Sequence, residues 1–434
     1  MSKSTLLSLG FMTFALFLGA GNVIFPPQLG QGSGEHFLLA MSGFLITAVG
    51  LPALTLIAIA YMGGSDALTS RLPRWGHLLF WSVLFLSIGP LFSMPRTFTV
   101  AYEFTAKPFI GDTGLLMCTL AMAAVTLFFA LNPGKLMDRI GKILTPILLV
   151  MLVAIAVSAY LFPHGETLSI AKQYQEFAFA SGLSEGYMTM DVLGAVGFGW
   201  LVMNAIKEAS PKSAILPSMT RVVLIYSVAM SLVYIAIAYV GANYGQAETN
   251  GGAILSNYMN WIYGVPGVIL LGFVIFMACL TTAIGLTCAS AEFVSKNFSS
   301  CNYKVSAIVI VAVTTLVANL GLDMLIAITL PLVVVLHPVA ITVICLALLN
   351  VKRPVSGLTY SLTLITAIAG GIVDALKILE KMPSDIHATF IQYLPLYQYN
   401  AGWLVPTMVS FLLFSNICGL NKKSNINRVN NTST

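Results

Sequence analysis

Residues 17–27 read Phe17-Leu18-Gly19-Ala20-Gly21-Asn22-Val23-Ile24-Phe25-Pro26-Pro27. They fall in the first apolar segment of the chain, where an uninterrupted helix would carry leucines in place of two glycines, an asparagine and a pair of prolines. A glycine costs about 1 kcal/mol relative to alanine in a helix interior. We therefore predict that the first helix is interrupted at residues 19–22.

The composition of the whole chain indicates that this segment lies in a membrane. Of the 434 residues, 58% are hydrophobic and only 9% are charged, whereas about a quarter of the residues of a soluble protein are charged. So few charges cannot cover a water-exposed surface. The basic residues form no runs interleaved with aromatics, and the six cysteines show no metal-ligand spacing. Both observations argue against a nucleic-acid-binding protein and a metal centre.

Charge-free apolar runs predict an all-α polytopic membrane protein with about twelve transmembrane helices, because roughly 20 apolar residues cross a bilayer. We expect the helices near 6–28, 38–62, 77–99, 114–132, 142–161, 189–207, 220–242, 266–293, 304–320, 324–349, 356–378 and 396–417. They would form a single transmembrane domain over residues 1–434, ending in a polar tail at 421–434.

The basic residues predict which side of the membrane each loop faces. If the N-terminus is cytoplasmic, 16 of the 21 lysines and arginines lie on the inner side. The outer ones are Arg96, Lys107, Lys172, Lys377 and Lys381. This positive-inside bias predicts that both termini lie in the cytoplasm. We expect the membrane to be the inner membrane of a bacterial cell, since the sequence shows no organelle address.

A second glycine-rich stretch lies five helices further on. The sixth expected helix contains Gly194-Ala195-Val196-Gly197-Phe198-Gly199, which predicts an interruption there as well. Interrupted helices in corresponding positions of two halves are typical of the binding site of a transporter. Because five is odd, the second set of five helices would enter the membrane from the opposite side. We therefore predict two inverted five-helix repeats, at about 6–161 and 189–349.

Unwound backbone leaves amide and carbonyl groups without helical partners. Freed amides at residues 19–22 would bind a carboxylate, helped by the dipole of the half-helix, and freed carbonyls would bind an ammonium group or Na⁺. The alternative for both glycine stretches is that small residues let neighbouring membrane helices pack closely.

A candidate cation site lies in the eighth expected helix. Ala278, Thr281 and Thr282 are spaced i, i+3 and i+4, so they share one helix face. One carbonyl and two hydroxyls there, with carbonyls near Ala15 and Leu18 of the first helix, would form a neutral oxygen site that suits Na⁺ or Li⁺. The alternative is that each threonine bonds the carbonyl four residues before it in its own helix.

These motifs resemble those of the bacterial branched-chain amino acid:cation symporters. The resemblance rests on residues 17–27, on Gly89-Pro90 with Pro95-Arg96, and on Leu280-Thr281-Thr282-Ala283, and it extends over essentially the whole chain. It implies a leucine-transporter-like fold, in which two further helices at about 356–417 follow the two repeats.

The resemblance also implies a function, which is import of leucine, isoleucine and valine with Na⁺ by alternating access. In that fold, the amino acid moiety would be bound by Gly19, Ala20, Gly21 and Asn22. The side-chain pocket would be lined by Gly197, Phe198 and Gly199. The Na⁺ ligands would be Ala15, Leu18, Ala278, Thr281 and Thr282. Ala195 stands where some fold relatives have a hydroxyl residue, so we expect one coupling ion.

Two charged residues near the expected interruptions have two interpretations each. Arg96 is either a snorkelling side chain that reaches the lipid headgroups or part of an outer gate opposite Asp191. Asp191 either complements the N-terminus of the sixth helix or takes part in that gate. No acid is clearly placed in the middle of the membrane, which argues against proton coupling.

Other functions fit the sequence less well. A proton-coupled or exchange-type amino acid permease is the main alternative to Na⁺ symport. The sequence has no metalloprotease or serine-hydrolase motif at a suitable place and no P-loop, so we expect neither enzyme activity nor a cofactor. The expected partners are the amino acid, Na⁺ and the lipid bilayer, with no nucleic acid and no obligate protein partner.

Overall fold

The computed structural model describes residues 1–131, 145–163, 168–248, 250–298, 300–352 and 354–415. The expected polar tail at 421–434 lies outside these residues, as do the start of the helix expected near 142 and several of the basic residues that predict the orientation. Within the described ranges the regular elements are helices, as the composition predicts.

The first half of the chain forms helices joined by two π-helical turns, Ile46–Gly50 and Ser87–Leu91. In order, the helices are α1 (Lys3–Phe17), α2 (Gly21–Ser33), α3 (Phe37–Leu45), α4 (Leu51–Met62), α5 (Arg74–Leu86), α6 (Ser93–Thr105), α7 (Lys107–Ile110), α8 (Leu115–Ala130) and α10 (Thr145–Leu161).

The second half continues with longer helices. They are α11 (Lys172–Met188), α12 (Asp191–Ala209), α13 (Ile215–Ala242), α14 (Gly251–Asn297), α15 (Tyr303–Ala318), α16 (Leu322–Lys352), α17 (Gly357–Ile378), α18 (Ser384–Tyr393) and a last helix at Leu404–Ser415. The last one begins later than the expected residue 396, because Leu396 and Asn400 adopt left-handed backbone conformations in the turn before it.

Seven helices in the described part of the chain are long and apolar enough to cross a membrane, and five shorter apolar helices accompany them. A helix satisfies its backbone N–H and C=O groups with hydrogen bonds inside the helix, which a lipid environment requires. The all-α membrane architecture is therefore confirmed, while the number of crossings stays a prediction.

The first span is interrupted at residues 18–20, which overlaps the predicted interruption at 19–22 but leaves Gly21 and Asn22 helical. Helix α1 ends at Phe17 and α2 begins at Gly21, and the residues 18–20 between them are not helical. The Leu18 amide still donates to the Phe14 carbonyl at 2.8 Å. Beyond that bond, the carbonyls of the last turn of α1 have no partner within the helix.

The second interruption is not where the sequence predicts. The glycine stretch 194–199 lies inside α12, which is a continuous helix. The interruption comes earlier, at Thr189 and Met190 between α11 and α12, and Met190 has a left-handed backbone with φ of 64°. The expected sixth helix at 189–207 therefore covers only α12, because α11 contains many polar residues and its sequence is typical of a loop. The expected start of the second repeat at 189 stays a prediction.

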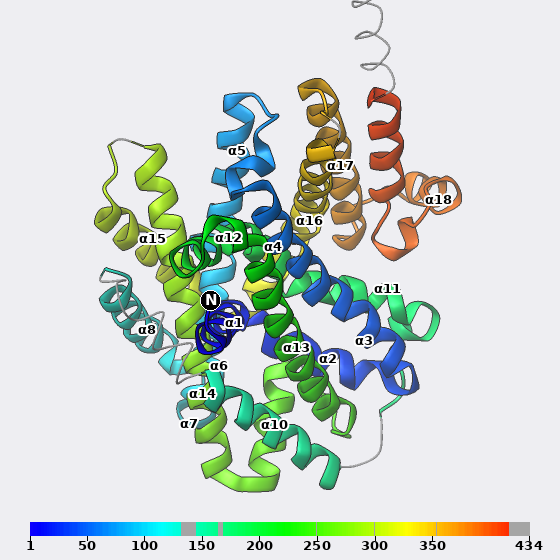
Figure 1. Cartoon of the computed structure of the whole chain (residues 1–434). Coiled ribbons are helices and arrows are strands. Elements are labelled where there is room, and N and C mark those ends of the chain that lie inside the picture. The colour runs from blue at the N-terminus through cyan, green and yellow to red at the C-terminus, as the bar shows by residue number, and fades with distance from the viewer. Residues whose placement is uncertain (132–144, 164–167, 249, 299, 353, 416–434) are drawn as a thin grey trace, which may run out of the picture. The chain divides into compact units, whose positions relative to one another are not determined.

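Each interrupted span packs against the helix that follows the other interrupted span. Helix α13, which follows α12, packs along both α1 and α2, and α3, which follows α2, packs along α11 (Figure 1). Such reciprocal packing is what two inverted repeats would require. The repeat itself, with the layout of helices within it, stays a prediction.

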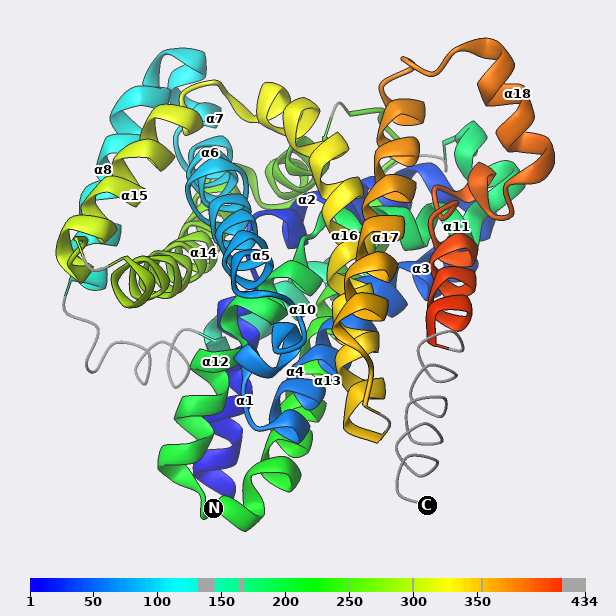
Figure 2. The ribbon, with the colours of Figure 1, turned by 90° about the horizontal axis from the view of Figure 1, so that it is seen from above.

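The described chain divides into two compact units. Their boundaries are Met1–Tyr61 with Val83–Thr329 for the first and Met62–Ser82 with the residues from Leu330 on for the second. Within the second unit, α16 and α17 lie side by side (Figure 2), with Gly371 against the backbone of Val335. All of the predicted site residues belong to the first unit.

Glycines bring α2 and α13 into close contact within the first unit. A Cβ atom on Gly30 would lie 1.8 Å from the Ala238 carbonyl oxygen, and one on Gly241 would lie 2.0 Å from the Pro27 carbonyl oxygen. Neither position has room for a side chain unless the backbone moves. Small residues at helix contacts allow such close packing in membranes.

We expect Gly241→Ala to destabilise the folded protein by about 1–3 kcal/mol, because the added methyl group forces α13 away from the backbone of α2. Gly50→Ala is the matched control, since its new Cβ would have only the Leu45 carbonyl oxygen nearby, at 3.7 Å. Thermal denaturation in detergent measures both variants. Equal denaturation midpoints would contradict the packing argument.

Candidate functional site

A small buried cavity lies at the two interruptions. Residues of α1, α2, α6, α12 and α14 form its wall together with the segments that join α1 to α2 and α11 to α12. Its volume is about 20 Å³, which is room for about one water molecule. The predicted site residues in its wall are Gly19, Ala20, Gly21, Asn22, Phe198 and Thr282.

Thr281 connects α14 to the end of α1. Its hydroxyl donates to the carbonyl oxygens of Ala15, at 3.0 Å, and of Ala278, at 2.8 Å. The Ala15 carbonyl is one of those that the last turn of α1 leaves without a helical partner. The Thr281 hydroxyl therefore lies within hydrogen-bonding distance of two of the other four predicted cation ligands.

Thr282 makes a second connection to the same helix end. Its hydroxyl lies 3.2 Å from the Leu16 carbonyl oxygen and 3.3 Å from the Leu18 carbonyl oxygen. A Cβ atom on Gly19 would lie 3.2 Å from the Thr282 methyl carbon, so the unwound segment rests on this side chain. These contacts contradict the alternative that each threonine bonds only within its own helix. They also add the Leu16 carbonyl, which the sequence does not predict.

A second polar cluster joins the N-termini of α2 and α12. The Asn22 amide nitrogen lies 3.0 and 2.8 Å from the two carboxylate oxygens of Asp191. The Tyr234 hydroxyl of α13 donates to the same carboxylate at 2.5 Å, and the side-chain oxygen Oδ1 of Asn22 accepts from the backbone amide of Gly19 at 3.3 Å. Asn22 is 2% exposed and Asp191 is 5% exposed, so these bonds compensate groups that water does not reach.

Arg96 of α6 is also buried, with 3% of its surface exposed. Its Nη1 donates to the Met188 carbonyl at 2.9 Å and its Nη2 to the Thr189 carbonyl at 3.3 Å, at the carbonyl end of α11. The guanidinium carbon lies 5.6 Å from the centre of the Phe25 ring. The snorkelling interpretation is therefore wrong, because protein encloses this side chain.

Asp191 is an acid buried inside the protein, whereas the sequence alone does not clearly place an acid in the middle of the membrane. Since the sixth span is interrupted at residues 189–190, Asp191 is the first residue of α12, and it lines the cavity. The positive end of the α12 dipole stabilises its carboxylate, as one of the two interpretations of this residue requires. The sequence feature that could have identified Asp191 as a site residue is its charge, because charged residues are costly inside membrane domains and usually have a function there.

The predicted residues of the sixth span have different positions. Phe198 lines the cavity and packs against Phe17, with ring centroids 5.7 Å apart. Gly197 and Gly199 lie within continuous α12 and are not among the described residues of the cavity wall. A Cβ atom on Gly197 would lie 2.3 Å from the Ile88 terminal carbon. The prediction that these glycines unwind the helix is wrong, because Gly197 serves close packing.

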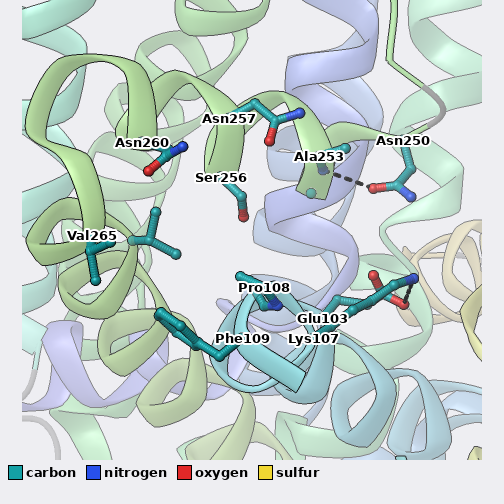
Figure 3. Close-up of a pocket in the computed structure, with 12 residues that line it drawn as sticks. Glu103, Lys107, Pro108, Phe109, Asn250, Ala253, Ser256, Asn257, Asn260 and Val265 are labelled. Carbon is teal, nitrogen blue, oxygen red and sulfur yellow. Dashed lines mark hydrogen bonds and ion pairs between the residues drawn. The ribbon is translucent and has the colours of Figure 1, made fainter. Parts of the chain in front are cut away.

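A roomier cavity opens between the end of α6 with α7 and the first part of α14 (Figure 3). Its volume is about 580 Å³, and its wall carries Asn257, Asn260 and the ion pair of Lys107 with Glu103, at 2.9 Å. The predicted site residues are not among those described in its wall. We assign the candidate site to the smaller cavity, because the interrupted helices, the buried charges and the predicted residues meet there.

The fold is shared with membrane transporters of known structure. Mhp1, a nucleobase-cation-symport-1 family transporter in a closed conformation with bromovinylhydantoin bound, matches with a TM-score of 0.64 at 16% identity, over 96% of this chain and 93% of that chain. A manganese transporter of Eremococcus coleocola matches with a TM-score of 0.57 at 13% identity, over 94% and 95%. At this identity the similarity concerns the fold alone, which is that of a polytopic membrane transporter.

The chain belongs to the branched-chain amino acid transport protein family, whose model matches residues 2–420. A branched-chain amino acid transport system 2 carrier protein of Pseudomonas aeruginosa is 42% identical over 417 residues, 94% of each chain. Branched-chain amino acid permeases BrnQ of Escherichia coli and Bacillus subtilis are 38% and 36% identical, over 94% and 96% of each chain. The family is therefore one of bacterial multi-pass carriers, not of enzymes.

We expect Asn22→Ala to destabilise the folded protein by about 1–3 kcal/mol, because it removes the amide that faces both oxygens of a buried carboxylate. Tyr234→Phe removes a single donor and should cost about 1 kcal/mol. Tyr226→Phe is the control, since the buried Tyr226 hydroxyl has no hydrogen-bond partner among the described residues. Thermal denaturation in detergent ranks the three variants, and a loss no greater for Asn22→Ala than for Tyr226→Phe would contradict the network.

Proposed function

We propose that this chain is a sodium-coupled secondary symporter that imports leucine, isoleucine and valine by alternating access. The substrate class is supported by the family and by the names of its relatives. The coupling ion, Na⁺ or Li⁺, is supported by the oxygen atoms gathered at the end of α1, and one ion is proposed for each transport cycle.

The observation that carries the coupling proposal is the convergence of two threonine hydroxyls on the carbonyl end of α1. Hydroxyls and carbonyls are hard, neutral donors, whereas sites for divalent hard cations use carboxylates. The negative end of the α1 dipole adds to the attraction for a cation. The proposed ligands are the carbonyls of Ala15, Leu18 and Ala278 and the hydroxyls of Thr281 and Thr282.

For the substrate we propose residues Gly19–Asn22, in which the unwound segment meets the first turn of α2, together with the Phe198 ring. Helix α2 begins at Gly21, so its N-terminal amides and dipole favour an anionic carboxylate. The Phe198 ring offers an apolar surface to a branched side chain. A cavity of about 20 Å³ has to widen before leucine enters, and alternating access provides that movement.

The proposed location is the bacterial inner membrane, with both termini in the cytoplasm. This placement is supported by the excess of lysine and arginine on one side of the predicted spans. In that orientation Na⁺ enters down the membrane potential, which releases about 2.3 kcal/mol per charge per 100 mV. One ion per substrate then suffices for accumulation against a gradient.

A proton-coupled permease is the second candidate, and the burial of Asp191 favours it. Asp191 is the one acid among the described residues of the cavity wall, and intramembrane acids serve as proton relays in pumps and transporters. The two candidates differ in the driving gradient. An imposed pH gradient in sodium-free medium would drive uptake by a proton-coupled permease but not by the Na⁺ symporter.

We expect proteoliposomes of the purified protein to accumulate leucine under an imposed inward Na⁺ gradient. Thr281→Ala and Thr282→Ala should each raise the half-saturating Na⁺ concentration about tenfold or more, because each removes a ligand worth about 1.4 kcal/mol or more. Thr287→Ala is the matched control, since this buried threonine of α14 donates to the Ala283 carbonyl of its own helix at 2.7 Å.

Uptake that is indifferent to Na⁺ and Li⁺ would remove the coupling proposal and leave the permease. If uptake depends on Na⁺ but Thr281→Ala and Thr282→Ala behave like Thr287→Ala, the ion binds elsewhere. Absence of leucine uptake under every gradient, from protein that remains folded, would contradict the proposed substrate.

A further inference from the structure

Two buried charges remain without a role in the proposed transport cycle. Arg96 and Asp191 both line the small cavity at the interruptions, from α6 and from the start of α12. Each has at most 5% of its surface exposed. Burial of a charge is costly unless a specific partner compensates it, so the partners of these two groups indicate what the cavity is built to hold.

Each of the two charged side chains forms its hydrogen bonds with neutral groups. The hydrogen bonds of Arg96 go to the carbonyls of Met188 and Thr189, and its Nε has no hydrogen-bond partner among the described residues. The Asp191 carboxylate accepts from the amide of Asn22 and the hydroxyl of Tyr234. The two charges form no ion pair with each other within the described chain.

The rest of the cavity wall combines polar side chains, such as Asn22 and Thr282, with apolar ones. The apolar side chains include Leu16, Phe17, Ile88, Phe198 and Leu286. The wall therefore combines one fixed positive charge, one fixed negative charge and an aliphatic and aromatic surface. An α-amino acid with an aliphatic side chain carries the complementary set, which is a carboxylate, an ammonium group and an apolar branch.

We propose that Arg96, which lies beside Gly21 at the start of α2, binds the carboxylate together with the α2 amides, and that Asp191 binds the ammonium group of the transported amino acid. The proposal rests on the proposed function, and it names the side chains that recognise the zwitterion. A guanidinium offers parallel N–H donors that match the two oxygens of a carboxylate. The pair is neutral in sum, so a zwitterion compensates both charges without adding net charge to the buried site.

Asn22 holds the ammonium position while the cavity is closed. Its side-chain nitrogen faces both oxygens of Asp191, at 3.0 and 2.8 Å, as an ammonium group would. Entry of the substrate exchanges this amide for the ammonium group. Because Asn22 lies in the first turn of α2, the exchange frees the N-terminus of α2 from α12 and connects recognition of the substrate to movement of the half-helix.

A purely structural role for the two charges is the competing explanation. In that case Arg96 and Asp191 only bond the ends of α11 and α12, and their replacement would weaken binding of every ligand by the same factor. Recognition of separate charges makes a different prediction, because each residue would then affect only ligands that carry the complementary group.

The test measures equilibrium binding of three probes to the purified full-length protein in detergent with Na⁺. The probes are leucine, 4-methylpentanoate, which lacks the ammonium group, and 3-methylbutylamine, which lacks the carboxylate. The wild-type protein should bind leucine about tenfold or more tightly than either analogue, because each charge-assisted contact is worth about one decade of affinity or more. Equal binding of an analogue and leucine would overturn the proposal without any variant.

Asp191→Asn should weaken leucine binding about tenfold or more while leaving 4-methylpentanoate binding unchanged. Arg96→Gln should weaken leucine binding to a similar extent and leave 3-methylbutylamine binding unchanged. A parallel loss for all three probes would show a structural role and overturn the proposal. Size-exclusion profiles establish that each variant is folded.

Charge-conserving variants keep the test decisive if a neutral variant does not fold. Asp191→Glu should retain the preference for leucine over 4-methylpentanoate, whereas Arg96→Lys should reduce the preference for leucine over 3-methylbutylamine, because a lysine lacks the paired donors. The opposite pattern would overturn the assignment of the two charges. Asp374→Asn, which neutralises a buried acid of the second unit, and Arg71→Gln are the matched controls and should leave all three affinities in their wild-type ratio.

The two proposals fail in different ways. A wild-type protein that is folded but does not bind leucine would contradict the proposed function. A wild-type protein that binds leucine, with variants whose probe ratios do not change, would contradict only the roles of Arg96 and Asp191.

Discussion

Main-chain groups that the first interruption releases must find partners in a chain with few polar side chains. The unwound residues 18–20 leave carbonyls at the end of α1 and the Gly19 amide outside the helical ladder. Thr281 and Thr282 bond the carbonyls, and Asn22 bonds the amide. In a lipid-facing domain an unbonded backbone group costs several kcal/mol. The helix can therefore be interrupted here only because these polar side chains bond the freed backbone groups, and the same side chains form parts of a site.

The second interruption is compensated by charges. Arg96 lies at the carbonyl end of α11, where the helix dipole is negative, and Asp191 lies at the amide end of α12, where it is positive. Each charge therefore matches the dipole beside it. That match explains how both can stay buried without direct contact, and it leaves both available to a ligand that carries two charges of its own.

Much of the first interruption and of the threonine face could be predicted, because both are local. Glycine and asparagine at 19–22 weaken a helix locally, although the glycines at 194–199 do not interrupt α12, and the spacing of Thr281 and Thr282 places them on one face of any helix. The second interruption has no such local signal. Met190 adopts a left-handed backbone without being a glycine, which is uncommon and depends on contacts such as those of Arg96 with Met188 and Thr189. The burial of Arg96 likewise follows from how α6 packs and not from its neighbours in sequence.

The proposed ion site and the proposed substrate site draw on the same three unwound residues. The Leu18 carbonyl faces Thr282, and the amide of the next residue, Gly19, faces Asn22, which in turn holds Asp191. An ion that fixes the Leu18 carbonyl also fixes the orientation of the following peptide group, because the peptide bond is planar. Once the first ligand has ordered that segment, the second ligand binds with a smaller loss of conformational entropy. Each ligand then raises the affinity for the other by the same factor, as thermodynamic linkage requires. The planarity of one peptide group thus gives a physical reason why the ion and the amino acid would bind together.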